Sequence, residues 1–291
     1  MTAGRVAVVG SANLDIVVQS PHRPTAGETV LGTALTETPG GKGANQALAS
    51  ARVGPTAFVG QVGSDAAGDL LRTALAGAGV DVTHVRAAGV PSGRAYVTVT
   101  PDGENSIVVL PLANATLDAD RTVEALDAIG PAVVLTQLEI PPGAVEAAAD
   151  WCVRHGARFV LNPSPVGPVA ERVLAAADPL IVNRGEALAI LGTSGADTAD
   201  TADTADLATR LLGRARSVVV TAGPDGAVVA TDGACTHIPG ARVTVVDTTG
   251  AGDSFAGTLA AHLAAGRALD DAARLANAEA ARVIQLDRAG R

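Results

Sequence analysis

The chain has few aromatic and few basic residues. Of its 291 residues, 2% are Phe, Trp or Tyr, and 21 Lys and Arg stand against 30 Asp and Glu, a formal net charge of −9. Single-stranded nucleic acid is usually held by stacking on aromatic side chains, and nucleic acids and anionic membranes attract concentrated positive charge. We therefore expect neither nucleic acid nor a membrane surface as a partner.

Cysteine is also rare, and no long apolar run is present. Cys152 and Cys235 form no metal-binding or redox pair, and no stretch approaches the roughly 20 apolar residues of a membrane span. The N-terminus lacks a signal-peptide layout, because Gly4 and Arg5 lead directly into a short predicted strand. These features predict a cytoplasmic protein, since a reducing compartment suits unpaired cysteines.

Short β-branched runs alternate with alanine-rich runs of helical period along most of the chain. Strands are predicted at residues 5–10, 57–62, 132–137, 158–161, 179–182 and 217–221. Helices are predicted at residues 44–53, 66–77, 119–129, 143–155, 184–191 and 206–215. The alternation is typical of βαβ units and predicts an α/β fold with a doubly wound, mainly parallel, Rossmann-like sheet.

Two segments break this alternation. Ile16–Thr38 and Gly93–Leu110 alternate polar and apolar residues, contain turn residues and show no helical period. They predict a small antiparallel sheet that covers one edge of the main domain as a lid. The predicted division is a β lid of residues 16–38 and 93–110 and a catalytic domain of residues 1–15, 39–92 and 111–291.

A glycine-rich turn near the C-terminus, Val246–Phe255, joins a predicted strand over Ala241–Val246 to a predicted helix over Phe255–Leu263. Its glycines let the backbone approach a ligand, and the N–H groups at a helix start suit a phosphate or an oxyanion. Asp253 would repel such an anion, which makes sense if it takes a proton from a hydroxyl that attacks phosphorus. A helix N-cap with a tight turn is the equally open alternative.

Polar residues also follow the first predicted strand. Asn13 and Asp15 lie two residues apart, so in extended chain both face the same side. An amide and a carboxylate together suit neighbouring sugar hydroxyls, because they offer both donors and acceptors. An Asx turn that closes the strand is the alternative.

The segment Pro39–Gln46 places three glycines around Lys42 at the start of a predicted helix. A phosphate-binding P-loop needs Ser or Thr after the lysine, and Gly43 stands there instead, so we reject that interpretation. What remains is a tight helix N-terminus from which Lys42 and Asn45 can reach a small ligand.

Three further motifs follow predicted strands. Glu139 ends one strand, and Asn183 and Glu186 begin a helix, where they either form a capping box or let Glu186 order water around Mg²⁺. The turn Thr221–Gly226 either holds a nucleotide against its backbone or is simply a hairpin. Ligands of doubly wound sheets bind at the carboxyl ends of the strands, so the motifs together predict one site.

Two of these motifs are specific: Gly40–Asn45 and Asp247–Asp253. All of the motifs occur along the chain in the same order as in the PfkB-type sugar kinase family. From Val6 to about Gly290 the chain resembles this family, and within it the ribokinase branch. The resemblance implies a doubly wound α/β domain with a β lid, a homodimer joined through the lid, and ATP-dependent phosphorylation of the 5-hydroxyl of D-ribose. Deoxyribose, nucleosides and fructose are the alternative substrates.

The resemblance also implies roles for individual residues. The sugar would be held by Asn13, Asp15, Gly41, Lys42, Asn45 and Glu139. The base would be Asp253, with an anion hole formed by Gly250, Ala251 and Gly252. ATP would be contacted by Asn183, Thr221, Gly223, Asp225, Gly226, Gly252 and Asn277. Mg²⁺ would be placed with help from Glu186, and an activating K⁺ would be bound by Asp247 and Thr249.

Two other classes of protein are the alternatives to a sugar kinase. A dinucleotide oxidoreductase fits poorly, because Gly250-Ala251-Gly252 lacks the third glycine at the required spacing. A sugar-binding protein without turnover stays open, since the family pattern continues past Arg291 with residues that complete the cation site and a wall of the adenine pocket. We expect both to be incomplete here, while Asp253 favours an active enzyme.

Overall fold

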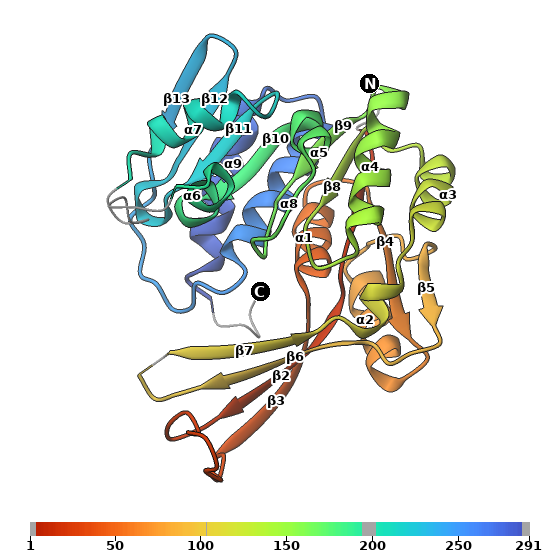
Figure 1. The fold of residues 1–291 in the computed structure, drawn as a ribbon, viewed down its shortest axis with the longest axis vertical. Coiled ribbons are helices and arrows are strands. Elements are labelled where there is room, and N and C mark those ends of the chain that lie inside the picture. Colours follow the sequence, from red (N-terminus) through yellow and green to blue (C-terminus); the bar gives the residue numbers. More distant parts are fainter. Residues whose placement is uncertain (1–3, 103, 194–201, 287–291) are drawn as a thin grey trace.

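A computed structural model describes residues 4–102, 104–193 and 202–286, and it has the predicted α/β fold. Figure 1 shows the main sheet between two layers of helices, with a smaller sheet projecting from one end. In spatial order the main sheet contains β13 (Ala234–Ile238), β12 (Ala227–Thr231), β11 (Val218–Thr221), β10 (Ala177–Asn183), β9 (Arg158–Leu161), β8 (Val133–Thr136), β1 (Val6–Val9), β4 (Thr56–Gly63) and β5 (Val85–Ala88). The β11–β12 and β12–β13 pairs are antiparallel, and the other neighbours are parallel.

Two hydrophobic cores lie on opposite faces of this sheet. Val6 and Val8 contribute to one core and Ala7 and Val9 to the other, as the strand period of two requires. The first face is covered by α1 (Lys42–Ala51), α2 (Ala66–Gly77), α8 (Ala251–Ala264) and α9 (Leu269–Val283). The second is covered by α3 (Ala119–Ile129), α4 (Pro142–His155), α5 (Glu171–Ala176), α6 (Arg184–Leu191) and α7 (Thr204–Leu212). Within the described residues, none of the helices has the length and apolar character to cross a membrane.

The strand order reverses at β1. From β1 the chain builds the sheet outward through β4 and β5 on one side, and through β8, β9, β10 and β11 on the other. Beyond the carboxyl ends of β1 and β8 lies the crevice where doubly wound folds bind ligands. The residues that follow these two strands are Gly10–Ala12 and Gln137–Glu139.

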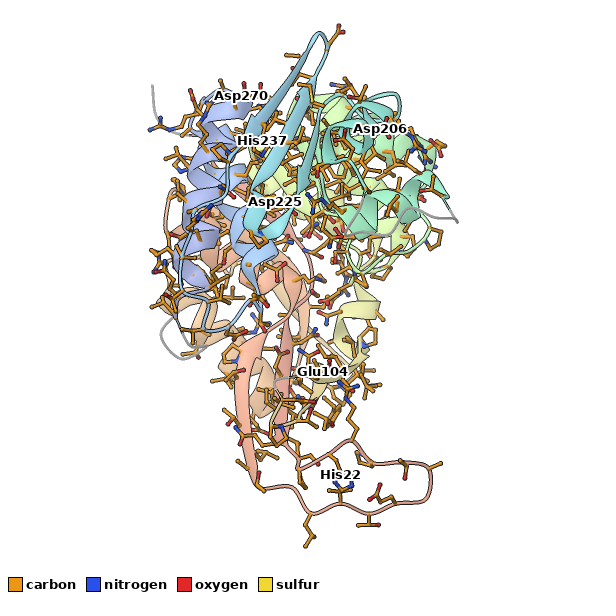
Figure 2. The ribbon with its side chains drawn as sticks, turned by 90° about the vertical axis from the view of Figure 1, so that its left-hand side faces the viewer. His22, Glu104, Asp206, Asp225, His237 and Asp270 are labelled. Carbon is orange, nitrogen blue, oxygen red and sulfur yellow. The ribbon has the colours of Figure 1, made fainter. Side chains whose placement is uncertain are left out.

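The smaller sheet consists of β3 (Ala34–Gly40), β2 (Asn13–Gln19), β6 (Gly93–Val99) and β7 (Asn105–Leu110), in that spatial order. We expected an antiparallel sheet, which was wrong for its central pair, because β2 and β6 run parallel. The chain passes through α1, β4, α2 and β5 before it forms β6, and such a crossover allows parallel pairing. Figure 2 shows this lid extending away from the main domain, with His22 in its outermost loop.

Helices α1 and α8 pack closely beside the crevice. A Cβ on Gly257 of α8 would clash with the carbonyl oxygen of Gln46 and lie 2.9 Å from Cβ of Ala49. The absence of a side chain at Gly257 therefore lets the two helices meet at backbone distance. Their N-termini, at Lys42 and Ala251, reach the same end of the sheet.

The strand predicted over Ala241–Val246 does not form. This segment has no strand pairing, and Val245 and Val246 are 55% and 60% exposed. Instead, the Val246 N–H donates to the carbonyl oxygen of Ile284 at 2.8 Å, where α9 ends. The segment thus passes over the end of a helix rather than joining the sheet, and α8 begins at Ala251, before the predicted Phe255.

Candidate active site

Three donors converge on one carboxylate oxygen of Glu139, just after β8. The Ser11 hydroxyl donates to Oε2 at 2.6 Å, the Lys42 backbone N–H at 3.1 Å and the Asn13 side-chain amide at 3.4 Å. Ser11 follows β1, Asn13 begins β2 and Lys42 begins α1, so the carboxylate ties together three segments. Asn13 and Glu139 also line a cavity of 320 Å³ between the lid and the main sheet.

Glycines on both sides of Lys42 allow this approach. Gly41 has a φ of 90°, which favours glycine, and a Cβ there would lie 2.8 Å from the Asn13 nitrogen. A Cβ on Gly43 would lie 2.5 Å from the nitrogen of Ser11. Larger residues would push α1 away from the segment after β1, so the glycines place Lys42 beside Glu139.

Asn114 fixes the start of β2 from the other side. It lies in the 3₁₀ turn η1 (Leu112–Thr116) and is 1% exposed. Its Oδ1 accepts from the Ala12 N–H at 2.9 Å, and its Nδ2 donates to Oδ1 of Asn13 at 2.7 Å. Both ends of the Asn13 amide are therefore held, one by Asn114 and one by Glu139.

The Asp253 carboxylate is held by two consecutive amides of α1. Asn45 Nδ2 lies 3.2 Å from Oδ2, and Gln46 Nε2 lies 3.1 Å from Oδ1. Gln46 Nε2 also donates to Asn162 Oδ1 at 3.1 Å, and Asn162 Nδ2 donates to the Ile181 carbonyl oxygen at 3.0 Å. Because a fixed donor faces each oxygen, the carboxylate has a defined orientation.

Burial raises the pKa of the Asp253 carboxyl above its ordinary value. The Lys42 cation and the amide donors of Asn45 and Gln46 oppose this rise, whereas the Glu139 carboxylate adds to it. The residue is only 8% exposed, which is why desolvation dominates. A carboxylate with a raised pKa is a stronger general base, so the environment suits proton transfer.

Asp253 lies in the first turn of α8, whose N-cap Gly250 has a φ of 74°. The first N–H groups of a helix have no partner within the helix, and together with the helix dipole they attract anions. One of them, that of Ala251, donates to the carbonyl oxygen of Thr248 at 3.2 Å. The start of α8 is thus suited to a phosphoryl group, with the carboxylate of Asp253 beside it.

A cavity of 450 Å³ begins at this helix start. Five predicted ATP contacts line it: Thr221, Gly223, Gly226, Gly252 and Asn277. Its walls include the apolar side chains Val243, Val245, Phe255 and Ile284. The Thr221–Gly226 turn is a hairpin between β11 and β12 and also lines this cavity. Apolar walls that lead to a helix N-terminus suit a base and the phosphates of a nucleotide.

The model of pfkB family carbohydrate kinases matches residues 3–290. The chain belongs to this family. The kinase is 36% identical over 280 residues to a ribokinase of Bacillus subtilis. The aligned region covers 94% of this chain and 90% of that protein. The motif-based resemblance is therefore confirmed at the level of the family.

Two solved structures are similar to the kinase. One is Arabidopsis thaliana ribokinase complexed with ribose and ATP, with a TM-score of 0.87 and 29% identity over 98% of this chain and 94% of that one. The other is a ribokinase from Cryptococcus neoformans in complex with ADP, with a TM-score of 0.83 and 30% identity over 99% of this chain and 95% of that one. They share the mainly parallel sheet and the lid.

Asn183 and Glu186 form the capping box that was the competing interpretation of their motif. Asn183 Oδ1 accepts from the Glu186 N–H at 2.8 Å, and Glu186 Oε2 accepts from the Asn183 N–H at 2.9 Å. Asp225 pairs with Arg184 at 2.9 Å. None of these residues lines the 450 Å³ cavity, although Asn183 is the strand partner of Thr221, which does.

The residues expected to bind K⁺ form a small turn before α8. The Thr249 N–H donates to Oδ1 of Asp247 at 2.8 Å, as in an Asx turn. In the part of the chain that the structure describes, no group of three or more His, Cys, Asp or Glu side chains could hold a metal ion. The chain end at residues 288–291, where we expected the cation site to be incomplete, lies outside the described residues.

Four buried polar residues of the site were missed from the sequence: Ser11, Gln46, Asn114 and Asn162. Ser11 and Gln46 adjoin predicted site residues, and Asn162 follows β9 at the carboxyl edge of the sheet, so position could have indicated all three. Asn114 follows a lid strand and carries no such signal.

Proposed function

We propose that this kinase transfers the terminal phosphoryl group of ATP to the 5-hydroxyl of D-ribose. The main support for the proposal is the position of Asp253. Its carboxylate contacts Asn45 on the side of the expected sugar ligands, while its neighbour Gly252 lines the nucleotide cavity. The ribokinase identities of about one third support ribose among the sugars that the family phosphorylates.

In this mechanism Asp253 accepts the proton of the sugar hydroxyl as the oxygen attacks phosphorus. The amides of Asn45 and Gln46 keep its oxygens aimed at that hydroxyl. The backbone N–H groups of Gly250 and Gly252 and the positive end of α8 stabilise the charge that develops on the transferred group. The N–H of Ala251 would join them on leaving the carbonyl oxygen of Thr248. Closure of the lid would exclude water from the reaction.

The expected ion sites consist of oxygen donors. Mg²⁺ bound with ATP would neutralise charge on the phosphates, and Glu186 would hold it through water, since Mg²⁺ keeps much of its hydration shell. One oxygen of Glu186 caps α6, and the other has no hydrogen-bond partner among the described residues. Asp247 and Thr249 would hold K⁺ with the hard oxygen ligands that such cations prefer.

The polar residues around Glu139 favour a small sugar with many hydroxyl groups. Asn13, Asp15 and Lys42 present amide, carboxylate and ammonium groups from adjoining segments. One observation favours a nucleoside as second candidate, because the 320 Å³ cavity beside Asn13 also has apolar walls from Val109 and Ile140. A base attached to the sugar could occupy that space.

Coupled ADP release with a panel of D-ribose, 2-deoxyribose, D-fructose, adenosine and uridine would test the proposal, with and without K⁺. D-ribose should have the highest kcat/KM, and K⁺ should increase the rate. A higher kcat/KM with adenosine or uridine would instead identify a nucleoside as the substrate. No ADP release with any of them would contradict a sugar kinase of this group.

We also propose a homodimer joined through the lid. Tyr96 and Val108 are cross-strand partners, 45% and 61% exposed, and the strand period places them opposite to the face of Asn13 and Asp15. Leu35, 64% exposed, lies on the same face. An exposed apolar surface of this kind is typical of an interface between subunits.

A further inference from the structure

Asn114 lies where three strands of the lid meet the main domain. β2 begins at Asn13, β6 begins at Gly93, and β7 ends at Leu110, shortly before Asn114. Asn114 is buried, and together with Asn13 and Glu139 it lines the 320 Å³ cavity. A Cβ on Gly93 would clash with the side chains of both Asn13 and Asn114. The glycine therefore leaves room for these two amides to meet.

The side-chain amide of Asn114 has one possible orientation. Its Oδ1 accepts from the Ala12 N–H at 2.9 Å, and its Nδ2 donates to the Ala12 carbonyl oxygen at 3.2 Å. A backbone N–H only donates and a carbonyl oxygen only accepts, so a flipped amide would lose both hydrogen bonds. Nδ2 also donates to Oδ1 of Asn13 at 2.7 Å. Both N–H groups of the Asn114 amide are therefore used.

This orientation determines that of Asn13. Because Oδ1 of Asn13 faces a donor, its Nδ2 lies on the other side, 3.4 Å from Oε2 of Glu139. One N–H of Asn13 and the Oε1 oxygen of Glu139 then have no hydrogen-bond partner among the described residues. A donor and an acceptor side by side match a hydroxyl group, which accepts one hydrogen bond while it donates another.

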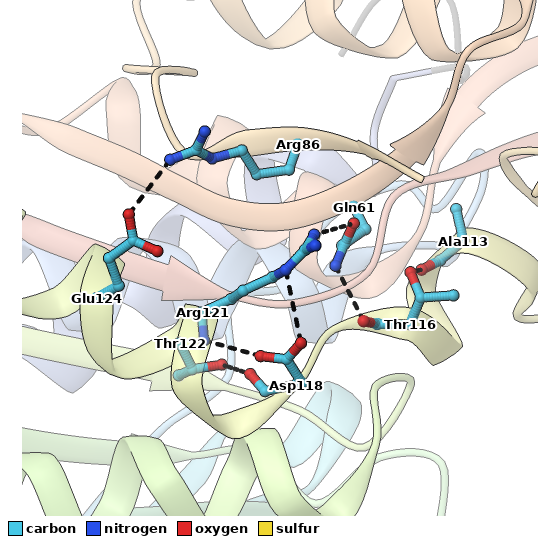
Figure 3. A network of polar contacts seen from close by, with 8 residues as sticks. All are labelled: Gln61, Arg86, Ala113, Thr116, Asp118, Arg121, Thr122 and Glu124. Carbon is cyan, nitrogen blue, oxygen red and sulfur yellow. Dashed lines mark hydrogen bonds and ion pairs between the residues drawn. The ribbon is translucent and has the colours of Figure 1, made fainter. Parts of the chain in front are cut away.

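The 3₁₀ turn η1, which carries Asn114, is fixed to the main sheet. Gln61 of β4 is 1% exposed, and Figure 3 shows its amide reaching the carbonyl oxygen of Thr116, to which Nε2 donates at 2.9 Å. The Thr116 hydroxyl donates to the Ala113 carbonyl oxygen at 2.7 Å. The Ala113 N–H donates to the carbonyl oxygen of Pro91 at 3.0 Å. These contacts hold the turn, and with it Asn114, without any ligand.

The backbone of η1 is strained at its first residue. Leu112 has a φ of 46°, and among the described residues it is the one non-glycine residue with a positive φ. This conformation is uncommon for leucine and costs free energy. Such strain persists where the surrounding contacts impose it, and it is concentrated at functional sites. The strain therefore indicates that η1 does more than connect β7 to α3.

We propose that Asn114 is a positioning residue, which fixes Asn13 as a hydrogen-bond donor toward the substrate, beside the acceptor Oε1 of Glu139. Asn114 acts through Asn13 and takes no part in the proton transfer. This inference rests on the proposed function, because it takes Asn13 and Glu139 as ligands of the sugar. The orientation that Ala12 imposes on Asn114 does not depend on it.

A double-mutant cycle of Asn13→Ala and Asn114→Asp tests the proposal. The carboxylate in Asn114→Asp still accepts from the Ala12 N–H, but it places an oxygen against Oδ1 of Asn13. The Asn13 amide should turn around, so that the substrate loses its donor. The KM for the sugar should rise at least roughly tenfold, while the KM for ATP stays within about twofold of the parent value. In the Asn13→Ala background, the same substitution should raise the KM for the sugar by less than about twofold.

Asn105→Asp, the same change at an exposed position of β7, is the matched control and should have the KM values of the parent. Equal increases in the KM for the sugar and for ATP would overturn the proposal, because they indicate a general disturbance of the structure. So would increases in the two single variants that multiply in the double variant. Asn114→Ser, which buries no charge, takes the place of Asn114→Asp in the cycle if thermal melting shows that the latter is unfolded.

Hydrogen exchange of the Ala12 amide, measured by NMR without substrate, tests the orientation of Asn114 separately. The Ala12 N–H should be protected in the parent and should exchange at least roughly tenfold faster in Asn114→Ser, which lacks Oδ1. An equal rate in both would overturn the contact on which the proposal depends. The kinetic cycle uses the sugar with the highest kcat/KM in the panel. If the parent phosphorylates none of them, the proposed function is contradicted, whereas the exchange experiment still decides the orientation.

Discussion

Gln46 and Asp253 meet through a hydrogen bond in which Nε2 of the amide lies 3.1 Å from Oδ1 of the carboxylate. Both side chains are buried, and the other end of the amide, Oε1 of Gln46, has no hydrogen-bond partner among the described residues. A buried acceptor without a partner costs about 1–3 kcal/mol. We infer that this cost is tolerated because Gln46 orients the base.

Asp253→Asn should lower kcat by about two to four orders of magnitude, the usual scale for loss of a general base. Sugar binding should be retained, because the other sugar ligands are unchanged. Steady-state kinetics and a binding titration measure the two effects. A kcat within threefold of the parent would remove Asp253 from the mechanism.

Gln46→Met should shift the acid limb of the pH profile of kcat/KM to higher pH. Burial already raises the pKa of Asp253, and the Gln46 donor opposes that rise, so its removal raises the pKa further. The base must be deprotonated to act, and activity is lost as the pH falls through this pKa. Gln19→Met, at an exposed lid position, is the control and should leave the profile unchanged. An acid limb at the same pH in Gln46→Met and the parent would show that Gln46 does not lower the pKa of the base.

Asp15→Ala tests the sugar assignment. In the parent, kcat/KM for ribose should exceed that for 2-deoxyribose by roughly tenfold or more, because a site built for a hydroxyl leaves a buried polar group unpaired when it is missing. The variant should bind ribose more weakly, and its ratio of kcat/KM for ribose to that for 2-deoxyribose should be smaller. Equal kcat/KM for the two sugars in the parent, or a ratio untouched by the substitution, would contradict the placement of Asp15.

Gly257→Ala should lower the free energy of unfolding by about 1–3 kcal/mol, because the new methyl group clashes with the backbone of Gln46. Gly77→Ala is the matched control, since a Cβ there meets no atom within 4 Å. It should be neutral or stabilising by up to about 1 kcal/mol. Urea unfolding measures both, and equal effects would argue against close packing of α1 and α8.

The double variant Tyr96→Glu/Val108→Glu should sediment as a monomer, because two charges on the outer lid face oppose burial in an interface. Val153→Glu places one such charge on α4 at a position that is 58% exposed, and should behave as the parent. Analytical ultracentrifugation distinguishes the species. If the parent protein is itself a monomer, the proposed lid dimer is contradicted.

Helices were predictable where local capping sets their ends. The bounds of α2, α3 and α6 match the predicted ones. Asp65, Asp118 and Asn183 accept hydrogen bonds from the first turns of these helices, and Gly130 and Gly192 end two of them in the left-handed conformation. Such signals lie within a few residues of the helix end, so the sequence displays them.

Pairing partners were not predictable in the same way. The alternation in Ala241–Val246 indicates extended backbone, but it does not specify whether a strand or the end of α9 accepts the hydrogen bonds. The parallel β2–β6 pair aligns Asn13 with Gly93, so it depends on a long crossover between segments that are distant in sequence. Likewise, Ser11 and Glu139 are 128 residues apart, and only the order of the strands brings them together.

Asn13 and Asp15 belong to β2, a strand of the lid, whereas Glu139, Asn45 and Asp253 belong to the main domain. A sugar bound by all of them would cross-link the two sheets. Its residence time would then be tied to the rate at which the lid opens, and replacements on the lid far from any hydroxyl could alter turnover through release of the phosphorylated product.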